Sequence, residues 1–301
     1  MALKDILDTA ARHSTKPKSE TEVTTDRIRA CMPEMRKLIA YWRVYPDRFV
    51  DFLCSLNPNN TFKMYYFQRV YLRVCMRHQL CYCVFPRGYS KSFLGDLALI
   101  LKAILYPGAQ LFTVASGKQQ SADILKEKVE TICSLIPAIE KEIIWDNRNS
   151  GARKKTVATK DSVSYSFKNG SSIRNIAASE NSRGLRFHSG LIEECAMFED
   201  QSILNEVVLP TMNVKRSING EVDDNEVLNQ GQLFITTAGY KNSFSYEKLL
   251  QIFAQMVARP QKAIIIGGTW RVKKTGALLK HSERLASGVL TKNVKANGRR
   301  E

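Results

Sequence analysis

The sequence predicts an α/β protein in which a mostly parallel sheet has helices on both faces. From residue 61 onward, short runs of consecutive apolar residues alternate with longer helical stretches. Runs that are apolar at every position are typical of strands buried on both faces, and regular alternation with helices favours parallel pairing. A third observation is a polar segment with an Asn-Gly pair at its centre, which predicts a β-hairpin.

The elements follow one another in a regular order along the chain. Strands are expected at residues 80–85, 109–116, 188–197, 232–239 and 262–270. Helices are expected at residues 91–105, 121–136, 202–212 and 245–259. The hairpin is expected within residues 155–179, with its turn at Asn169-Gly170.

The N-terminal part of the chain has a different pattern. Residues 24–56 predict one or two helices, with Thr25 or Asp26 as the N-cap. Helical spacing places Leu38, Tyr41, Trp42 and Tyr45 on one face, and these side chains are expected in the core. We therefore divide the chain into a helical extension (1–60), a main domain (61–270) and a basic tail or linker remnant (271–301).

Charge and cysteine content narrow the class of protein. The chain has 45 Lys and Arg against 29 Asp and Glu, a net charge of +16, which favours a polyanionic partner such as nucleic acid or an anionic membrane. No apolar run reaches the roughly 18 to 20 residues of a membrane span, and the first residues do not resemble a signal peptide. The seven cysteines form no zinc pattern and are expected to be reduced, with Cys81 and Cys83 on one face of a buried strand. The chain is expected to be intracellular.

The turn after the first buried strand carries the first candidate chemistry. Residues 86–92 read Pro-Arg-Gly-Tyr-Ser-Lys-Ser, and a buried helix follows. A helix N-terminus attracts anions, so Lys91 is expected at the β- and γ-phosphates of a nucleotide and the Ser92 hydroxyl at Mg²⁺. Arg87 and the backbone around Gly88 would add to phosphate binding. Ser90 stands where the usual loop has glycine, so the motif by itself matches weakly and a basic surface turn is the alternative.

An acid pair follows a later strand. Glu193-Glu194 directly follows the apolar residues of the strand expected at 188–197. Phosphoryl transfer needs one acid near Mg²⁺ and another to position or deprotonate water. The first acid is expected on a strand beside the loop strand. Two further pieces are weaker individually: Thr236-Thr237 at a strand end, and Gln68, whose amide can both donate and accept.

Taken in order, these residues resemble the ATPase domain of a tailed-bacteriophage terminase large subunit. The resemblance covers residues 60–270 and rests on Gln68, "PRGYSKSF", Glu193-Glu194 and "FITTAG". It implies a RecA-like P-loop ATPase that uses ATP and Mg²⁺ to move double-stranded DNA into a procapsid in the host cytoplasm. It also implies a ring, expected to have five subunits, on the capsid portal, together with a small terminase subunit.

The resemblance assigns a role to each matching residue. Gln68 would contact adenine, while Arg87, Gly88, Ser90, Lys91 and Ser92 would form the phosphate loop. Glu193 would be the acid on the Mg²⁺ side, where the family usually has Asp. Glu194 would be the catalytic glutamate, and Thr236-Thr237 would couple hydrolysis to movement.

Two further expectations concern the rest of the chain. After Asp224 the sequence has no Asp and few Glu, so no metal-dependent nuclease activity is expected, as in an excised or truncated ATPase domain. A ring ATPase can borrow an arginine from its neighbour. Arg183 and Arg186 are the leading candidates, ahead of Arg148, Arg153 and Arg174.

Two alternative functions are kept. One is a superfamily 2 helicase-like motor, which would need a second RecA-like domain. The other is a non-catalytic basic DNA-binding module with a decayed nucleotide site. No base-reading motif is present, so binding to DNA is expected without sequence preference, through Lys154, Lys155, Lys160, Lys168 and the tail.

Overall fold

A computed structural model describes most of the chain. The described residues are 20–145, 156–198, 202–218, 220–239, 241 and 243–268. The predicted basic tail lies outside them, and so do Arg148, Arg153, Lys154 and Lys155.

In the described part of the chain, the main sheet has the strand order β10-β1-β9-β6-β2-β5-β4-β3. The pairs from β10 to β5 are parallel, and the last two pairs are antiparallel. The strands are β1 (Leu80–Val84), β2 (Gln110–Val114), β3 (Val157–Ala158), β4 (Val163–Ser166), β5 (Ser172–Asn175), β6 (Ser189–Glu193), β9 (Gly231–Thr236) and β10 (Ala263–Gly267). This is the mostly parallel sheet predicted from the sequence.

The strand order corrects one expectation. The strand that carries the acid pair, β6, is not beside the loop strand β1, because β9 lies between them. The threonine pair at the end of β9 is therefore placed between the loop and the acids. Sequence periodicity shows which faces of a strand are buried, but it does not give the lateral order of strands.

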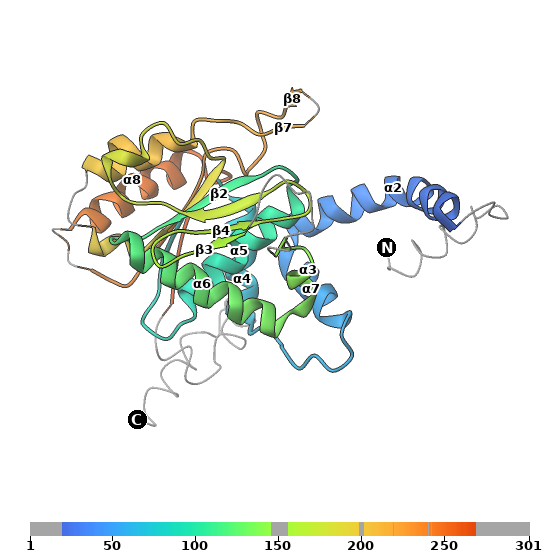
Figure 1. Cartoon of the computed structure of the whole chain (residues 1–301). Coiled ribbons are helices and arrows are strands. Elements are labelled where there is room, and N and C mark those ends of the chain that lie inside the picture. Colours follow the sequence, from blue (N-terminus) through green and yellow to red (C-terminus); the bar gives the residue numbers. More distant parts are fainter. Residues whose placement is uncertain are drawn as a thin grey trace, which may run out of the picture.

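Helices cover both faces of the sheet, in two layers (Figure 1). The first layer packs against the larger apolar core and consists of α4 (Tyr66–Arg77), α5 (Lys91–Leu105) and α6 (Lys118–Leu135), with the short α7 (Pro137–Glu140) beside it. The other layer consists of α8 (Phe244–Ala258) and the irregular helix at residues 203–212. Among the described residues, no helix is both long and apolar enough to cross a membrane.

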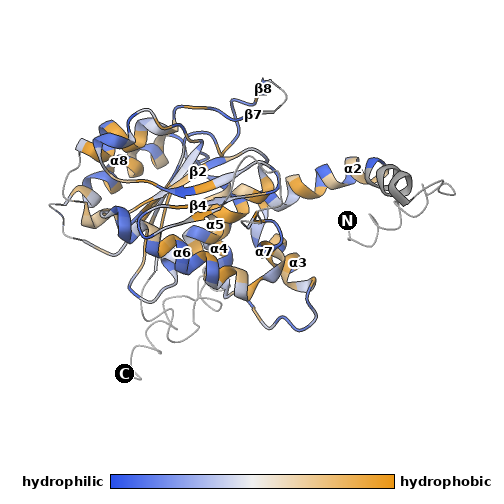
Figure 2. Cartoon of the chain, viewed as in Figure 1, coloured by the Kyte–Doolittle hydropathy of each residue, from blue (hydrophilic) through white to orange (hydrophobic). Residues whose placement is uncertain are grey.

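Helix α5 is buried around most of its circumference, as its sequence predicts (Figure 2). It lies very close to the sheet: a Cβ added to Gly95 would come within 2.5 Å of Ile235 Cδ1 and 3.1 Å of Leu191 Cδ2. Only a residue without a side chain allows that approach. The close packing fixes the position of the helix N-terminus, and therefore of Lys91 and Ser92, over β6 and β9.

The N-terminal segment forms two helices, α2 (Glu20–Val44) and α3 (Pro46–Ser55). Helix α2 begins at Glu20, so the prediction of an N-cap at Thr25 or Asp26 was wrong. Trp42 is buried and its ring lies 4.7 Å from that of Phe49, but Tyr41 is 46% exposed and does not join the core. Helical spacing placed Tyr41 near the buried stripe, but α2 extends away from the sheet and leaves part of that stripe uncovered (Figure 1).

The predicted hairpin is confirmed as β4 and β5, which pair in antiparallel fashion around the turn at Asn169-Gly170. Gly170 has a φ of 83°, a left-handed conformation that glycine adopts without strain. The hairpin extends the main sheet, because β5 also pairs with β2 in parallel.

The helix expected at 202–212 differs from prediction. Residues Ile203–Val208 form a π-helix and Leu209–Met212 a 3₁₀-helix. Pro210 has no backbone N–H and cannot continue an α-helical hydrogen-bond ladder, which accounts for the irregular geometry. The seven cysteines are all free thiols, as expected.

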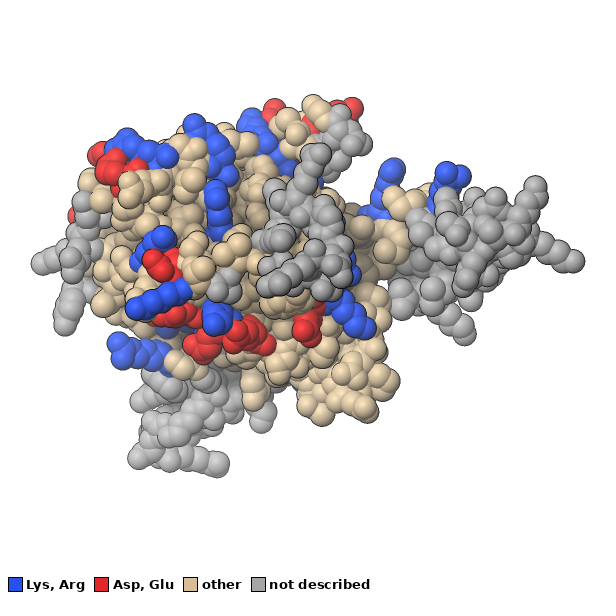
Figure 3. Space-filling model, in the orientation of Figure 1, with Lys and Arg blue, Asp and Glu red and all other residues tan. Residues whose placement is uncertain are grey.

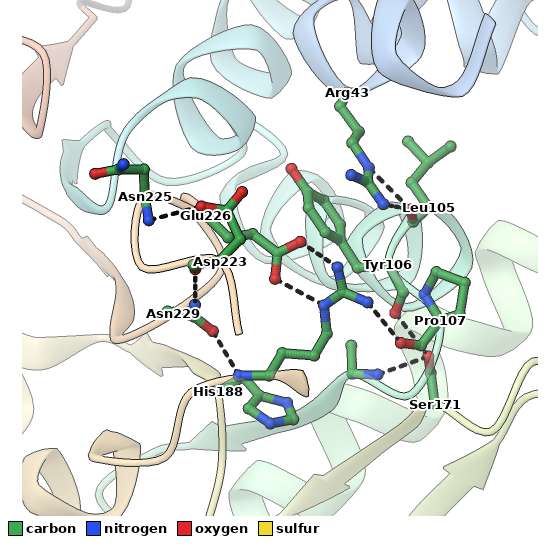
Figure 4. A network of polar contacts seen from close by, with 12 residues as sticks. Arg43, Leu105, Tyr106, Pro107, Ser171, His188, Asp223, Asn225, Glu226 and Asn229 are labelled. Carbon is green, nitrogen blue, oxygen red and sulfur yellow. Dashed lines mark hydrogen bonds and ion pairs between the residues drawn. The ribbon is translucent and has the colours of Figure 1, made fainter. Parts of the chain in front are cut away.

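A polar network closes the edge of the sheet where the parallel strands begin (Figure 4). The Arg216 guanidinium is buried and donates to Glu226 at 2.7 Å and to the Pro107 carbonyl at 2.9 Å. The backbone N–H of Arg216 donates to Asn229 Oδ1 at 2.8 Å. Arg43 of α2 donates to the Leu105 carbonyl nearby. The network joins the chain before β2 and β9 to the end of α5 and to α2.

Candidate active site

Three loops meet at the opposite edge of the sheet, where the parallel strands end. Val84 at the end of β1 is paired with Thr236 at the end of β9, and Glu193 at the end of β6 is paired with Ile235. The carboxyl ends of parallel strands form one edge, so the residues that follow them come together. The phosphate-loop candidates, the acids and the threonines all lie at this edge.

The loop after β1 turns sharply into α5. Gly88 has a φ of 71° and Ser90 a φ of 61°, so both residues are left-handed. That conformation suits glycine and is strained for serine. Ser90 thus keeps the backbone shape that a glycine would give, at a cost in free energy. Arg87 and Gly88 are exposed at the outer side of the turn.

Tyr89 holds this loop in place, a role that the sequence did not reveal. Its side chain is 1% exposed, and its ring lies 4.8 Å from Phe85 and 4.5 Å from Phe67. The contact with Phe67 attaches the loop to α4. A signal was present in the sequence, because an aromatic residue inside an otherwise polar turn indicates an anchor.

Lys91 begins α5, and its side chain is only 6% exposed. Its ammonium nitrogen lies 3.5 Å from Glu194 Oε1. A buried cation needs such a counter-charge. The ion pair joins the phosphate-loop candidate to the catalytic-acid candidate directly.

Glu193 is fully buried, and Oε2 accepts a hydrogen bond of 3.1 Å from the Ser92 hydroxyl. Burial raises its pKa to about 7; the charge of Glu194 adds to the rise, while the Ser92 hydroxyl and Lys91 oppose it. Its other oxygen, Oε1, has no hydrogen-bond partner. A buried oxygen without a partner beside a hydroxyl is a suitable donor set for Mg²⁺, which prefers oxygen ligands and keeps several waters. No group of three or more His, Cys, Asp or Glu in the described part of the chain could hold a metal ion.

Glu194 follows in the left-handed region, with a φ of 45°. Its Oε2 accepts hydrogen bonds from Thr237, at 3.3 Å from the backbone N–H and 3.4 Å from the hydroxyl. Thr236 accepts a hydrogen bond from the Ala196 N–H at 3.3 Å. Thr236 at the end of β9 and Thr237 directly after it therefore both contact the turn that carries Glu194.

Gln68 is buried in the first turn of α4, next to the loop anchor Phe67. Its amide oxygen accepts a hydrogen bond of 2.9 Å from the Tyr65 N–H and so caps the helix. The sequence led us to expect that this amide would both donate to a base and accept from it. Because its oxygen already caps the helix, only the amide nitrogen is left to contact a base. Its role as an adenine contact stays a prediction.

Asp96 is a buried acid that the sequence reading missed. It lies one turn after Ser92 in α5, is completely buried, and neither carboxylate oxygen has a hydrogen-bond partner. Burial raises its pKa well above the ordinary value, and the nearby charge of Glu193 raises it further. Its place within an apolar helix gave no indication of a site.

The two leading candidates for a donated arginine, Arg183 and Arg186, take no part in the contacts of this group of residues. Both precede β6, whereas the acid pair is at its end. Arg183 pairs with Glu180 on the surface, and Arg186 is exposed. A role as an arginine donated to a neighbouring subunit stays a prediction for both.

No family model and no curated protein matches the chain. Several solved structures are similar to it. One is a variant of the large terminase ATPase domain of Thermus phage P74-26, at 17% identity and a TM-score of 0.47, covering 75% of this chain and 89% of that one. Another is the large terminase of bacteriophage HK97, at 12% identity and a TM-score of 0.47, covering 69% of this chain and 40% of that one.

A third similar structure is the large terminase of a thermophilic bacteriophage in complex with ADP. It has 8% identity and a TM-score of 0.42, and covers 68% of this chain and 45% of that one.

Proposed function

We propose that this chain is an ATPase that drives the translocation of double-stranded viral DNA into a procapsid. One observation carries the hydrolytic part of the proposal. Lys91, Ser92 and the acid pair, which lie on α5 and β6, meet Thr237 after β9 at one edge of the sheet, with contacts of 3.1 to 3.5 Å. Such a group of residues can bind a polyphosphate and position a water against it.

Phosphate binding would use the start of α5. The free N–H groups at the helix N-terminus and the Lys91 ammonium provide positive charge, and Arg87 at the exposed side of the turn adds to it. Ser92 and Glu193 would hold Mg²⁺, which when bound offsets the charge of the phosphates. The Lys91–Glu194 ion pair would be exchanged when nucleotide binds, because the lysine then has a stronger anionic partner.

Water positioning would fall to Glu194. Released from Lys91, its carboxylate can accept a hydrogen bond from the attacking water and take up its proton. Thr237 holds one oxygen of this carboxylate, and Thr236 holds the backbone two residues later. A change at Glu194 is therefore transmitted to β9, which supports the proposed role of these threonines in coupling hydrolysis to movement.

The DNA-motor part of the proposal rests on charge and on the resemblance of the motifs. A net charge of +16 favours a nucleic-acid partner. The ring on a portal, the small terminase subunit and the absence of nuclease activity are proposed with it.

The test is steady-state ATP hydrolysis, with and without double-stranded DNA, for the wild type and two variants. Glu194→Gln should lower kcat by about 10²- to 10⁴-fold, because it removes the proton acceptor. Lys91→Ala should abolish nucleotide binding, measured by fluorescence titration. Lys262→Ala and Glu221→Gln, at exposed positions away from the site edge, are the matched controls and should behave as wild type.

Three outcomes of these measurements distinguish the possible functions of the chain. Hydrolysis lost in both site variants supports the proposal. Absent turnover with nucleotide binding that depends on Lys91 indicates a competent loop that needs the assembled ring. Absent binding in the wild type would contradict the proposal and favour a DNA-binding module with a decayed nucleotide site.

A further inference from the structure

The outer strands of the sheet are covered on one face only. Val163, Tyr165 and Ile173 of the β4–β5 hairpin are buried in the core formed with α5 and α6. Side chains alternate along a strand, so Ser164 and Arg174 point to the other face. On that face α8 and the irregular helix pack over the middle of the sheet, and Ser164 and Arg174 are half-exposed. We call the side chains of Ser164 and Arg174 the hairpin face.

Arg174 is partly desolvated but has no anionic partner. Its guanidinium lies over the Phe187 ring, 4.6 Å from the centroid. Burial lowers its pKa, and no carboxylate opposes that effect. Among the described residues, the side chain of Arg174 makes no hydrogen bond and no ion pair. A cation in this state is held at a cost in free energy that an anion would offset.

The lack of a hydrogen-bond acceptor distinguishes Arg174 from the other buried or partly buried arginines among the described residues. Each of those donates to a carboxylate or a backbone carbonyl: Arg43 to Leu105, Arg69 to Asp51, Arg73 to Asp47, Arg77 to Val44 and Arg216 to Glu226. The fold thus satisfies partly buried guanidinium groups as a rule and leaves one unsatisfied on an open sheet face.

The surroundings of Arg174 favour a phosphate backbone. The loops at the two ends of β4 carry exposed lysines, Lys160 before the strand and Lys168 after it, so Arg174 lies between them along the hairpin. Figure 3 shows a basic side chain on the surface where β2 and β4 lie, with the acidic side chains of this view gathered mainly below it, over α6. The hairpin face itself offers serine and arginine and no aromatic ring on which an unpaired base could stack.

We propose that the hairpin face binds the phosphate backbone of double-stranded DNA, with Arg174 as its central contact and Lys160 and Lys168 at its ends. The inference rests on the proposed function and adds a location for the DNA. Phosphate contacts carry no sequence information, so binding is independent of sequence. The contact lies on the same sheet as the candidate active site, with Lys160 at the end of the hairpin nearer to it.

The test is the salt dependence of binding to a mixed-sequence duplex of about 30 base pairs, followed by fluorescence anisotropy between about 50 and 200 mM salt. Arg174→Gln should weaken binding several-fold and reduce the slope of log K against log salt by about one. Arg174→Lys keeps the charge and should retain most of the slope. Arg48→Gln is the matched control, because it removes the same charge from an exposed position on α3 and should leave the slope near that of the wild type.

Several results would overturn the proposed role of Arg174 in DNA binding. Equal losses in Arg174→Gln and Arg48→Gln would mean that only net charge matters, and would overturn the inference. So would an unchanged slope in Arg174→Gln, or tighter binding of the wild type to single-stranded DNA or RNA than to the duplex. A fall in unfolding free energy in both Arg174→Gln and Arg174→Lys, with the slope unchanged, would assign Arg174 to packing on Phe187.

Failure of the hairpin-face proposal can be distinguished from failure of the ATPase proposal. DNA binding is measured without nucleotide, so Arg174→Gln should weaken it whether or not the chain hydrolyses ATP. If Lys91→Ala still hydrolysed ATP, the ATPase proposal would fail whatever the DNA result. If hydrolysis behaved as proposed and Arg174→Gln bound DNA as the wild type does, only the hairpin face would be wrong.

Discussion

Two buried acids, Glu193 at the end of β6 and Asp96 in α5, differ in how clearly the sequence indicates them as site residues. Glu193 ends an apolar strand and is followed by a second acid, a pattern that indicates chemistry. Asp96 lies alone among leucines and isoleucines. Both side chains are fully buried, and both have oxygens without hydrogen-bond partners. Their shared burial was decided by packing between α5 and the sheet, which the local pattern does not specify.

The raised pKa of Glu193 predicts a pH-dependent stability. Its folded-state pKa of about 7 lies above the ordinary value of 4.5, so between these values the native state binds more protons than the unfolded state. Its contribution therefore lowers the free energy of unfolding as pH rises through that window. Urea unfolding of the nucleotide-free protein between about pH 5 and pH 8 should show this decline, and Glu193→Gln should flatten it.

Asp96 belongs to the same series. Its pKa is raised by burial and by the charge of Glu193, so the two carboxyls titrate as a pair and Asp96→Asn should also make the decline shallower. Parallel stability curves for the wild type and Glu193→Gln would show that Glu193 is not desolvated as described. Binding of Mg²⁺ requires the ionised carboxylate, so its affinity should rise over the same window.

At the scale of elements, the phosphate-loop candidate depends on a hydrophobic anchor. The turn at residues 86–90 has two left-handed residues and no regular hydrogen-bond ladder. Tyr89 packs between Phe85 of the loop and Phe67 of α4, and so fixes the turn against two elements. The motif that indicated phosphate chemistry was correctly placed between a strand and a helix, but what holds its shape was not visible in the pattern.

Tyr89→Ala should destabilise the protein and weaken nucleotide binding together. Loss of a fully buried aromatic ring costs about 3 to 5 kcal/mol, measured by denaturant unfolding. Tyr89→Phe keeps the ring and should stay close to the wild type in both measurements. Nucleotide affinity unchanged in a folded Tyr89→Ala protein would show that the loop keeps its shape without this contact.

Other elements show which secondary structure the local sequence pattern can predict. The strand runs, the buried helix α5 and the hairpin turn were predicted because each is specified by neighbouring residues. The helix at 202–212 was not, because Pro210 allows more than one irregular geometry and packing selects one of them.

At the scale of the whole molecule, the two edges of the sheet have different roles. The candidate active site lies where the parallel strands end, and the Arg216 network lies where β2 and β9 begin (Figure 4). The network ties together segments far apart in the sequence, including α2 through Arg43. It gives the sheet a fixed edge opposite the three loops that carry the site.

Glu226→Gln should therefore destabilise the whole fold. Arg216 and Glu226 are both nearly buried, and removal of one partner leaves an uncompensated charge, which costs about 3 to 5 kcal/mol. The exposed pair between Lys215 and Asp224 in the same segment is the control. Asp224→Asn should change the free energy of unfolding by less than about 1 kcal/mol. Equal effects of the two substitutions would contradict the structural role of the network.

The sequence by itself determined the class of fold, the loop before α5, the acid pair and the threonine pair, because each is a local pattern of polarity and spacing. Only the tertiary structure decided that β9 lies between β1 and β6, which brings Thr237 to Glu194 and Lys91 to the same carboxylate. It also decided that the Arg174 side chain is partly buried without an anionic partner, and that Arg183 and Arg186 come before β6 while the acid pair is at its end. These facts depend on which strands pair and which faces are covered, and both follow from long-range packing that no local segment encodes.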